Sequence, residues 1–240
     1  GTDSSGFGRE STPFKTIQYA IDQLYSASYD WNEVSYDSII VQASDTIIVK
    51  PGTYVENITI NNKPVVIKST GGYTQTIIDG NQNGQVLTLY GGAIDRTTIL
   101  TGFTITKGDA GNNYGGGINI YDYASPTISN CVITVNEANY GGGGVRIANQ
   151  SAAVFTNVTI SDNESNSAGG GLWVESSNSN SIFTNLTVTN NDADGSGGGI
   201  YCYSCNATFD ALTVSGNNSE TEGSGIIVSG SSSAMVINNA

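Results

Sequence analysis

One basic and one acidic residue in the second half of the chain have the types that acid–base chemistry on a sugar requires. Arg146 and Glu175 each follow a run of glycines, at outward positions of short alternating segments one repeat apart. A polysaccharide lyase uses such a base and a cationic neutraliser, so this pair is the catalytic candidate. Lyases also need a cluster of basic residues, whereas Arg146 is the only Lys or Arg beyond Lys107. The sequence therefore predicts no complete catalytic centre.

Aromatic and charged side chains occupy the outward positions of the same segments and form a candidate ligand-binding strip. Successive side chains of a strand alternate between faces, so these residues share one face. The strip consists of Tyr121, Arg146, Trp173, Glu175, Tyr201 and Tyr203. Aromatic rings on an exposed sheet can stack on sugar rings, which predicts a polysaccharide or surface glycan as the partner. The alternatives are aromatic rings that only pack on one another along the ladder, and a docking surface for another protein.

Acidic residues recur at matching positions of the loops and form a candidate metal site. The column consists of Asp109, Glu137, Glu164 and Asp192. Calcium takes carboxylate and carbonyl oxygens in flexible geometry, and glycine-rich loops offer free carbonyls, so Ca²⁺ is the cofactor that these residues suggest. The alternative is a solvated acidic surface, because the loops lack the repeat of calcium-binding β-rolls.

The composition excludes several classes of function. The 240 residues contain no His and carry a formal net charge of −13, with only 12% charged residues. The lack of imidazole excludes Ser-His-Asp triads and His-ligated zinc, and the negative field disfavours nucleic acid and anionic membranes as partners. No apolar run in the sequence is long enough to span a membrane.

The elements that position these candidates repeat along the chain. Runs of glycine open directly into short apolar segments, as in Gly115-Gly116-Gly117-Ile118 and Gly142-Gly143-Gly144-Val145. The last glycines of the runs stand at positions 117, 144, 171, 199 and 225, which are intervals of 27, 27, 28 and 26 residues. A period of this length is typical of a solenoid, in which each repeat buries its apolar face only against its neighbours.

Each repeat is predicted to contain three short strands and two asparagine corners. The apolar alternation breaks at Asn157, where the chain must bend, and Asn tolerates the left-handed conformation that such a bend needs. Two columns of asparagine result, and their amides are expected to hydrogen-bond from coil to coil inside the stack. The first column is Asn130, Asn157 and Asn185, and the second is Asn136, Asn163, Asn191 and Asn217. The sequence thus predicts an all-β, right-handed parallel β-helix solenoid of about 26–28 residues per coil.

These motifs resemble the pectate-lyase-like parallel β-helix superfold. The glycine runs and F-x-N segments are similar to repeats of the polymorphic outer-membrane protein type, which occur in secreted and surface adhesins. Residues 47–58, and Thr76-Ile77-Ile78-Asp79-Gly80 in the next coil, resemble the first coils of secreted β-helix proteins. The resemblance covers roughly residues 46–240 and implies the fold. It implies no single activity, because lyases, esterases, epimerases and non-enzymes share this start.

Residues 1–45 are predicted to form an N-terminal cap, and residues 46–240 the β-helix. An amphipathic helix is expected over residues 13–25, with Thr12 as its N-cap and Pro13 at its first position. This helix would cover the open end of the first coil, with a loop or short hairpin beside it. The last residues are expected to belong to a coil that is cut short, as in a fragment of a longer protein.

Three cysteines leave an odd number, and two of them have the C-x-x-C spacing. Cys202 and Cys205 lack the helix start or further ligands that the redox and zinc versions of this motif require. We therefore expect all three, including Cys131, to pack as ordinary core residues. A local or coil-to-coil disulfide is the alternative.

The sequence as a whole favours a non-catalytic module, secreted or on the cell surface, that acts as an adhesin, a scaffold or a glycan-contacting rod. The first alternative is a carbohydrate-active enzyme of the polysaccharide lyase or epimerase type that uses the exposed strand face. The second alternative is a filament or fibre subunit whose β-helix ends associate with one another.

Overall fold

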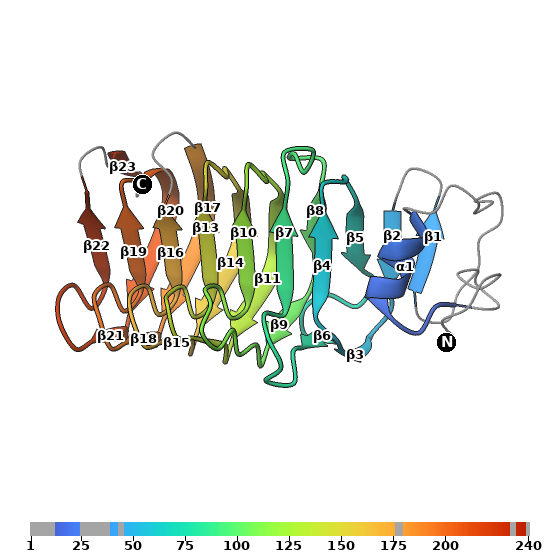
Figure 1. Ribbon diagram of the computed structural model, residues 1–240, viewed down its shortest axis with the longest axis horizontal. Coiled ribbons are helices and arrows are strands. Elements are labelled where there is room, and N and C mark those ends of the chain that lie inside the picture. The colour runs from blue at the N-terminus through green and yellow to red at the C-terminus, as the bar shows by residue number, and fades with distance from the viewer. Residues whose placement is uncertain (1–12, 25–38, 43–45, 176–179, 231–233, 239–240) are drawn as a thin grey trace.

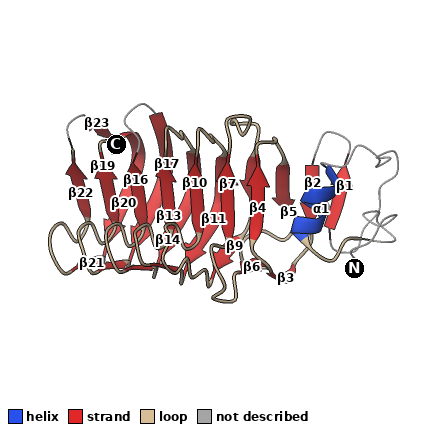
Figure 2. Cartoon of the chain, viewed as in Figure 1, coloured by secondary structure: helices blue, strands red, loops and turns tan. Residues whose placement is uncertain are grey.

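The chain forms an elongated stack of coils. The structure is a computed structural model that describes residues 13–24, 39–42, 46–175, 180–230 and 234–238. The strands of these residues make sheets of twelve, seven and four strands along the stack (Figure 1). Neighbouring strands pair in parallel, except for one antiparallel pair at the N-terminal end, where a short helix also lies (Figure 2). The architecture is the parallel β-helix that the periodic sequence predicts.

The seven-stranded sheet contains the short strands that follow the glycine runs. Its strands in chain order are β4 (Ile58–Asn61), β7 (Leu87–Tyr90), β10 (Ile118–Tyr121), β13 (Val145–Ala148), β16 (Leu172–Glu175), β19 (Ile200–Tyr203) and β22 (Ile226–Ser229). Ile118 pairs with Val145, which pairs with Leu172, and all three side chains point inward and are fully buried. The register is constant because a slip by one residue would turn every apolar side chain outward.

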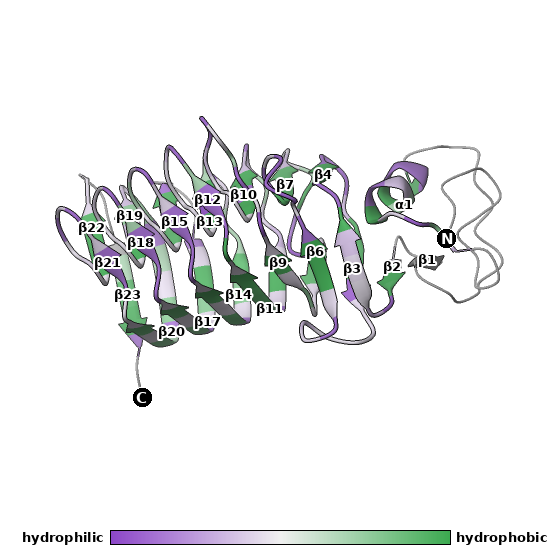
Figure 3. Ribbon diagram, turned by 90° about the horizontal axis from the view of Figure 1, so that it is seen from below, coloured by the Kyte–Doolittle hydropathy of each residue, from purple (hydrophilic) through white to green (hydrophobic). Residues whose placement is uncertain are grey.

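The twelve-stranded sheet contains the long strands on the other side of each coil (Figure 3). Its main path is β1 (Ile39–Gln42), β2 (Thr46–Val49), β5 (Val66–Ser69), β8 (Ile99–Thr101), β11 (Thr127–Thr134), β14 (Val154–Ser161), β17 (Asn180–Thr189), β20 (Asn206–Ser215) and β23 (Ala234–Asn238), with a side path of β3 (Gly52–Val55), β6 (Thr76–Asp79) and β9 (Thr104–Thr106). The sequence predicts two separate strands around the first asparagine corner, but β14 is one strand that bends at Asn157. Asn157 drops out of the pairing with β17, while the residues on both sides stay in register.

The glycine runs allow neighbouring coils to approach one another beside the shortest sheet. Its two-residue strands, which the sequence pattern does not predict, are β12 (Glu137–Ala138), β15 (Glu164–Ser165), β18 (Asp192–Ala193) and β21 (Asn218–Ser219). Gly142 has a φ of 65°, in the left-handed region that glycine adopts without strain. A Cβ on Gly143 would lie 2.1 Å from the carbonyl oxygen of Glu164. The first glycine therefore allows a backbone turn, and the second makes room for the next coil.

Both asparagine columns form hydrogen-bonded ladders, but only one of them lies inside the stack. Asn185 Nδ2 donates to Asn157 Oδ1 at 2.9 Å, Asn157 Nδ2 donates to Asn130 Oδ1 at 3.2 Å, and these side chains are exposed. In the second column, Asn163 Nδ2 donates to Asn191 Oδ1 at 2.9 Å, and Asn163 is only 1% exposed. The prediction that both columns are buried is wrong for the first, because its residues occupy the outside of the bend.

The helix α1 (Ile17–Leu24) begins later than the predicted range of residues 13–25. Two groups from outside the helix define its start. The backbone N–H groups of its first two residues donate to the Glu56 carboxylate at 2.9 Å each, and Thr16 Oγ1 accepts a third N–H at 3.3 Å. A carboxylate at this end satisfies unpaired donors and complements the helix dipole. The predicted N-cap, Thr12, lies outside the described residues.

The apolar face of α1 closes the N-terminal end of the stack, as the sequence predicts (Figure 1). Ile17, Ala20, Ile21 and Leu24 are buried in the same core as the first coils. Beside the helix, β1 pairs antiparallel with β2. Most of the stretch predicted as a loop or short hairpin, residues 25–44, lies outside the described residues. Within the described residues, no helix has the length and apolar character needed to cross a bilayer.

Cys202 and Cys205 form a disulfide, so the prediction that all three cysteines are ordinary core residues is wrong for this pair. The bond joins β19 to the residue that precedes β20, and both cysteines are fully buried. Their three-residue separation suits a turn between two strands, and the coil supplies such a turn without the helix start that redox motifs use. Cys131 is a buried free thiol, and burial raises its pKa to about 11.

Candidate functional site

The predicted ligand-binding strip lies on the outer face of the seven-stranded sheet. Arg146, Trp173 and Tyr201 stand in register on β13, β16 and β19 and form its first column. Glu175 pairs with Tyr203 in the second column, two residues further along the strands. The repeat thus brings these five residues together on one face.

Tyr121 lies apart from the other members of the strip. Its ring stacks on Tyr90 of β7, with ring centroids 5.2 Å apart and an interplanar angle of 12°. Burial raises the pKa of the Tyr121 hydroxyl, the neighbouring Tyr90 and Asp122 raise it further, and the charge of Arg146 on the next strand lowers it. The strand between Tyr121 and Glu175 is β13, which presents the buried Ala148 at this position. The predicted strip therefore consists of two aromatic patches.

Arg146 is covered, although the sequence predicts an exposed residue. The ring of Tyr114, from the loop before β10, lies over its guanidinium with Cζ 4.0 Å from the ring centroid. Arg146 Nη2 donates to Glu175 Oε2 at 3.4 Å, and the two side chains are 12% and 37% exposed. A buried cation needs such a partner, so the ion pair has a structural role in the sheet. Arg146 is therefore enclosed, whereas the paired Glu175 carboxylate stays partly exposed.

Trp173, Tyr201 and Tyr203 form a continuous aromatic surface. The rings of Trp173 and Tyr201 meet at 76° with centroids 5.4 Å apart, and those of Tyr201 and Tyr203 lie within 3° of parallel at 6.4 Å. Tyr203 is 44% exposed, whereas Trp173 is half-buried. The indole lies against the backbone of Gly141, where a Cβ would be only 1.8 Å from the ring. The accessible part of this surface is therefore at Tyr201 and Tyr203.

Two further tyrosines, Tyr114 and Tyr140, to which the sequence assigns no role, pack beside the strip. The rings of Tyr114 and Tyr140 meet edge to face with centroids 5.5 Å apart, and Tyr114 meets Trp173 in the same way at 5.4 Å. Both tyrosines directly precede a glycine run, which is the signal by which they could be found. Under them, Arg146 Nε and Trp173 Nε1 are buried and lack a hydrogen-bond partner among the described residues.

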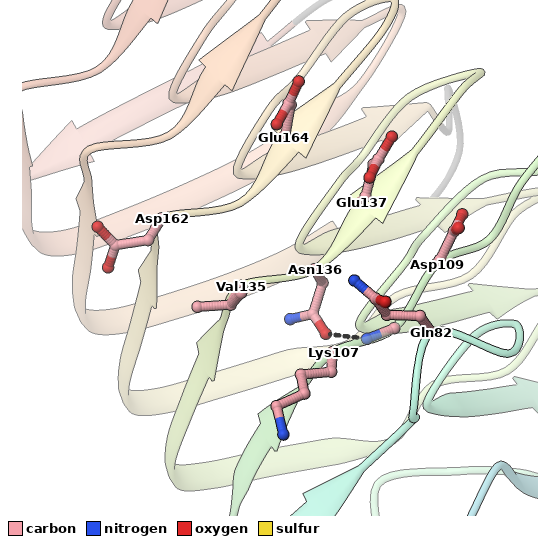
Figure 4. Close-up of a pocket in the computed structure, with 9 residues that line it drawn as sticks. Gln82, Lys107, Asp109, Val135, Asn136, Glu137, Asp162 and Glu164 are labelled. Atoms are coloured by element: carbon pink, nitrogen blue, oxygen red, sulfur yellow. Dashed lines mark hydrogen bonds between the residues drawn. The ribbon is translucent and has the colours of Figure 1, made fainter.

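The predicted acidic column is present at the edge formed by the shortest sheet. Glu137 pairs with Asp109 on one side and with Glu164 on the other, and Glu164 pairs with Asp192. Figure 4 shows the first three carboxylates in a row along the stack. Burial raises the pKa of the Glu137 carboxyl, and the charges of Asp109 and Glu164 raise it further. The column therefore concentrates negative charge on one edge.

A hollow of about 100 Å³ lies beside the acidic column (Figure 4). Its lining includes Glu137 and Glu164 together with Lys107, whose Nζ donates to Asp79 Oδ2 at 2.6 Å. Across the described ranges, no three Asp, Glu or Cys side chains gather closely enough to hold a metal ion. Calcium binding by the column stays a prediction.

One comparison with known proteins gives a match. A family model described as the right-handed β-helix region matches residues 79–240, which is more than half of the chain. No curated protein and no solved structure matches the chain significantly. The finer resemblance to repeats of polymorphic outer-membrane proteins stays a prediction. The family match and the parallel stack agree, and the chain belongs to the right-handed β-helix family.

Proposed function

We propose that the chain is a non-catalytic module, secreted or on the cell surface, that acts as a rigid rod and contacts glycans. The observation that carries this proposal is the aromatic surface of Trp173, Tyr201 and Tyr203 on the outside of a regular stack. Its parallel tyrosine rings offer flat apolar faces, which suit the faces of sugar rings. The sheet beneath them is rigid, because β16 and β19 are each paired on both sides.

The surroundings of Arg146 on the same face argue against catalysis. General acid–base chemistry needs a group that can reach the substrate with a free proton or lone pair. Arg146 is enclosed by Tyr114, and its charge is paired with Glu175. The alternative function, a polysaccharide lyase or epimerase, would need a second basic group here, and the chain has no Lys or Arg beyond Arg146.

The disulfide supports a location outside the reducing cytosol. Disulfides persist in secreted and surface proteins, whereas cytosolic thiols are kept reduced. The pair of Cys202 and Cys205 is fully buried and lies in the seven-stranded sheet and the turn after it. We therefore propose a secreted or cell-surface protein.

The test compares Tyr203→Ala with Tyr73→Ala. Tyr203 and Tyr73 are 44% and 43% exposed, so the two variants remove equally accessible rings, but Tyr73 lies in the turn between β5 and β6. Glycan arrays followed by calorimetry on the hits should show that Tyr203→Ala loses about 0.5–1.5 kcal/mol of binding free energy, while Tyr73→Ala loses none. Equal affinities for both variants would reject the aromatic surface as the contact.

A turnover assay on the same glycans separates the rod from the enzyme. Neutral and acidic polysaccharides are incubated with and without Ca²⁺, and ultraviolet absorbance and reducing ends are followed. We expect no product, and product that disappears in Arg146→Gln would replace the proposal with the enzymatic alternative.

The second alternative, a filament or fibre subunit, concerns apolar side chains on the last strands of this sequence, which another copy would cover in the same way as a further coil. Val228 of β22 is 46% exposed, although its partner Cys202 on β19 is fully buried. Val236 and Ile237 of β23 are 48% and 42% exposed. Apolar side chains on the last coil could pack against another copy. Light scattering that gives a mass independent of dilution and equal to one chain would reject this alternative.

A further inference from the structure

A second outer face of the stack is made almost entirely of threonine and serine. It lies on the twelve-stranded sheet, on the part of each long strand that follows the first asparagine corner, and we call it the threonine face. Its first column is Thr104, Val132, Thr159, Thr187 and Thr213, and its second column is Thr106, Thr134, Ser161, Thr189 and Ser215. Val132 is the single exception to the hydroxyl side chains.

The threonine face is a regular two-dimensional array. The parallel pairings place Val132 beside Thr104 and Thr159, and continue from Thr159 to Thr187 and on to Thr213 without a break. Neighbouring positions within a column are therefore about 4.8 Å apart, and the two columns, which lie two residues apart on each strand, are separated by about 6.6 Å. The array repeats both distances over five strands in the described stack.

Only part of the face keeps its hydroxyls available to solvent, because Thr104 donates to the carbonyl of Tyr73 at 2.8 Å, Ser161 donates to Thr134 at 3.3 Å, and Thr106 is only 9% exposed. Among the described residues, the hydroxyls of Thr159, Thr187 and Thr189 make no hydrogen bond to protein, and Thr213 is exposed. Each threonine presents a methyl group beside a hydroxyl that can donate one hydrogen bond and accept two. The residues between the columns, such as Ile160, point into the core and are fully buried, so the backbone under the array is held in place.

Strand propensity alone does not explain this uniformity. Threonine favours strands in general, but the outer face of the seven-stranded sheet contains Arg146, Trp173, Glu175 and Tyr201. The threonine face contains neither a charged nor an aromatic side chain, in a chain whose net charge is −13. A surface kept free of charges and rings over five strands suits an uncharged and periodic partner.

We propose that the threonine face binds the ordered water lattice at the surface of ice. Rows of hydroxyls about 4.8 Å apart hold their bound water in a periodic arrangement, which is what contact with a crystalline water surface requires. The methyl groups between these rows order the water around them without competing hydrogen bonds. A sugar surface is the less suitable occupant, because sugar-stacking aromatic rings lie on the seven-stranded sheet and none lies here.

The full chain is tested for thermal hysteresis and for inhibition of ice recrystallisation. Thr187→Tyr places a ring at the centre of the array and should abolish most of both activities. Val154→Tyr, on the same sheet but before the asparagine corner and in a column with Thr127 and Ile182, is the matched control and should keep them. Circular dichroism and melting temperature establish that both variants are folded, which is expected because Tyr favours strands.

Several results would overturn the assignment. A wild-type chain without hysteresis or recrystallisation inhibition has no ice-binding face. Equal activity in the wild type and Thr187→Tyr, or equal loss in both variants, would place the activity elsewhere. Sedimentation with crystalline cellulose or chitin that depends on Thr187, without any effect on ice, would assign the face to a polysaccharide crystal instead.

Discussion

The two asparagine columns repeat with the same period and form the same amide-to-amide bonds, yet they stabilise the stack in different ways. Asn157 is exposed and has a φ of 54°, so its own backbone makes the bend. Asn163 is buried and does not have a positive φ, and the bend before it is made by Asp162, whose φ is 55°. The first column therefore provides a backbone conformation, whereas the second provides hydrogen bonds in the core.

The buried column also forms hydrogen bonds with backbone groups of the neighbouring coil. Asn163 Oδ1 accepts from the backbone N–H of Asn136 at 3.1 Å, and its Nδ2 donates to the carbonyl of Ile133 at 3.0 Å. Each amide thus links its own coil to the coil before it. Two columns of the same residue type that repeat with the same period can therefore have unrelated physical roles.

Asn163→Ala should have the largest effect among these substitutions. It removes the side-chain partners of the Asn136 N–H and the Ile133 carbonyl and breaks the amide ladder in the core, at about 1–3 kcal/mol for each polar group that loses its bond. We expect a loss of about 3 kcal/mol or more, measured as a shift of the urea midpoint. Asn163→Gly should be no better, and recovery in the glycine variant would show that conformation matters at this corner too.

Asn157→Ala should cost less, about 1–2 kcal/mol, because alanine is strained in the left-handed conformation. Asn157→Gly should recover most of this loss, since glycine adopts the conformation without strain. Both variants are compared with the wild type by urea unfolding. If the glycine variant is as unstable as the alanine variant, the exposed ladder bonds stabilise the corner instead.

Ala211→Asn should stabilise the chain. Ala211 follows Asn185 in the exposed column and has a φ of 56°, so an alanine stands where asparagine is favoured. Asparagine there would relieve the strain and extend the ladder to Asn185, and we expect a gain of about 0.5–1 kcal/mol. The melting temperature measures it. An unchanged or lower melting temperature would contradict the assigned role of the exposed column.

Glu137 follows Asn136 of the buried column, and Glu137→Gln tests the effect of its charge on stability. This effect should be the smallest of the four. The pKa of Glu137 is raised in the folded protein, so its carboxyl keeps its proton to a higher pH than in the unfolded chain. As pH rises, the ionisation of this carboxyl therefore lowers the stability of the folded protein. The variant should therefore melt above the wild type at neutral pH, and the difference should vanish below the usual glutamate pKa of about 4.3. Glu222→Gln, at an exposed position outside the column, is the control. Equal shifts in both variants would exclude a local effect of the column.

The fold and the register of the candidate strip could be predicted from the sequence, because both follow from the period alone. Once the glycine runs align, Arg146 must fall beside Trp173, and Glu137 beside Glu164. Every inward residue also follows from alternation along the strand. Periodicity therefore predicts which residues are neighbours.

Accessibility could not be predicted in the same way. Tyr114 covers Arg146 from a loop, and the path of a loop does not follow from strand alternation. The start of α1 depends on Glu56, which lies far from the helix in sequence. The disulfide depends on how closely one turn brings Cys202 and Cys205, which the C-x-x-C spacing does not decide. In each case a long-range or loop contact decides the result.

Because the glycine run repeats, one complete coil can be duplicated or deleted in the gene without disturbing the contacts between coils. Gly117 N donates to Gly143 O at 3.1 Å, and Gly144 N donates to Gly170 O at 3.0 Å, so successive coils meet through the same bond. An in-frame duplication or deletion of one coil in the gene would join surfaces that already fit. The protein would become longer or shorter by about 4.8 Å at each such event, with no new fold to evolve.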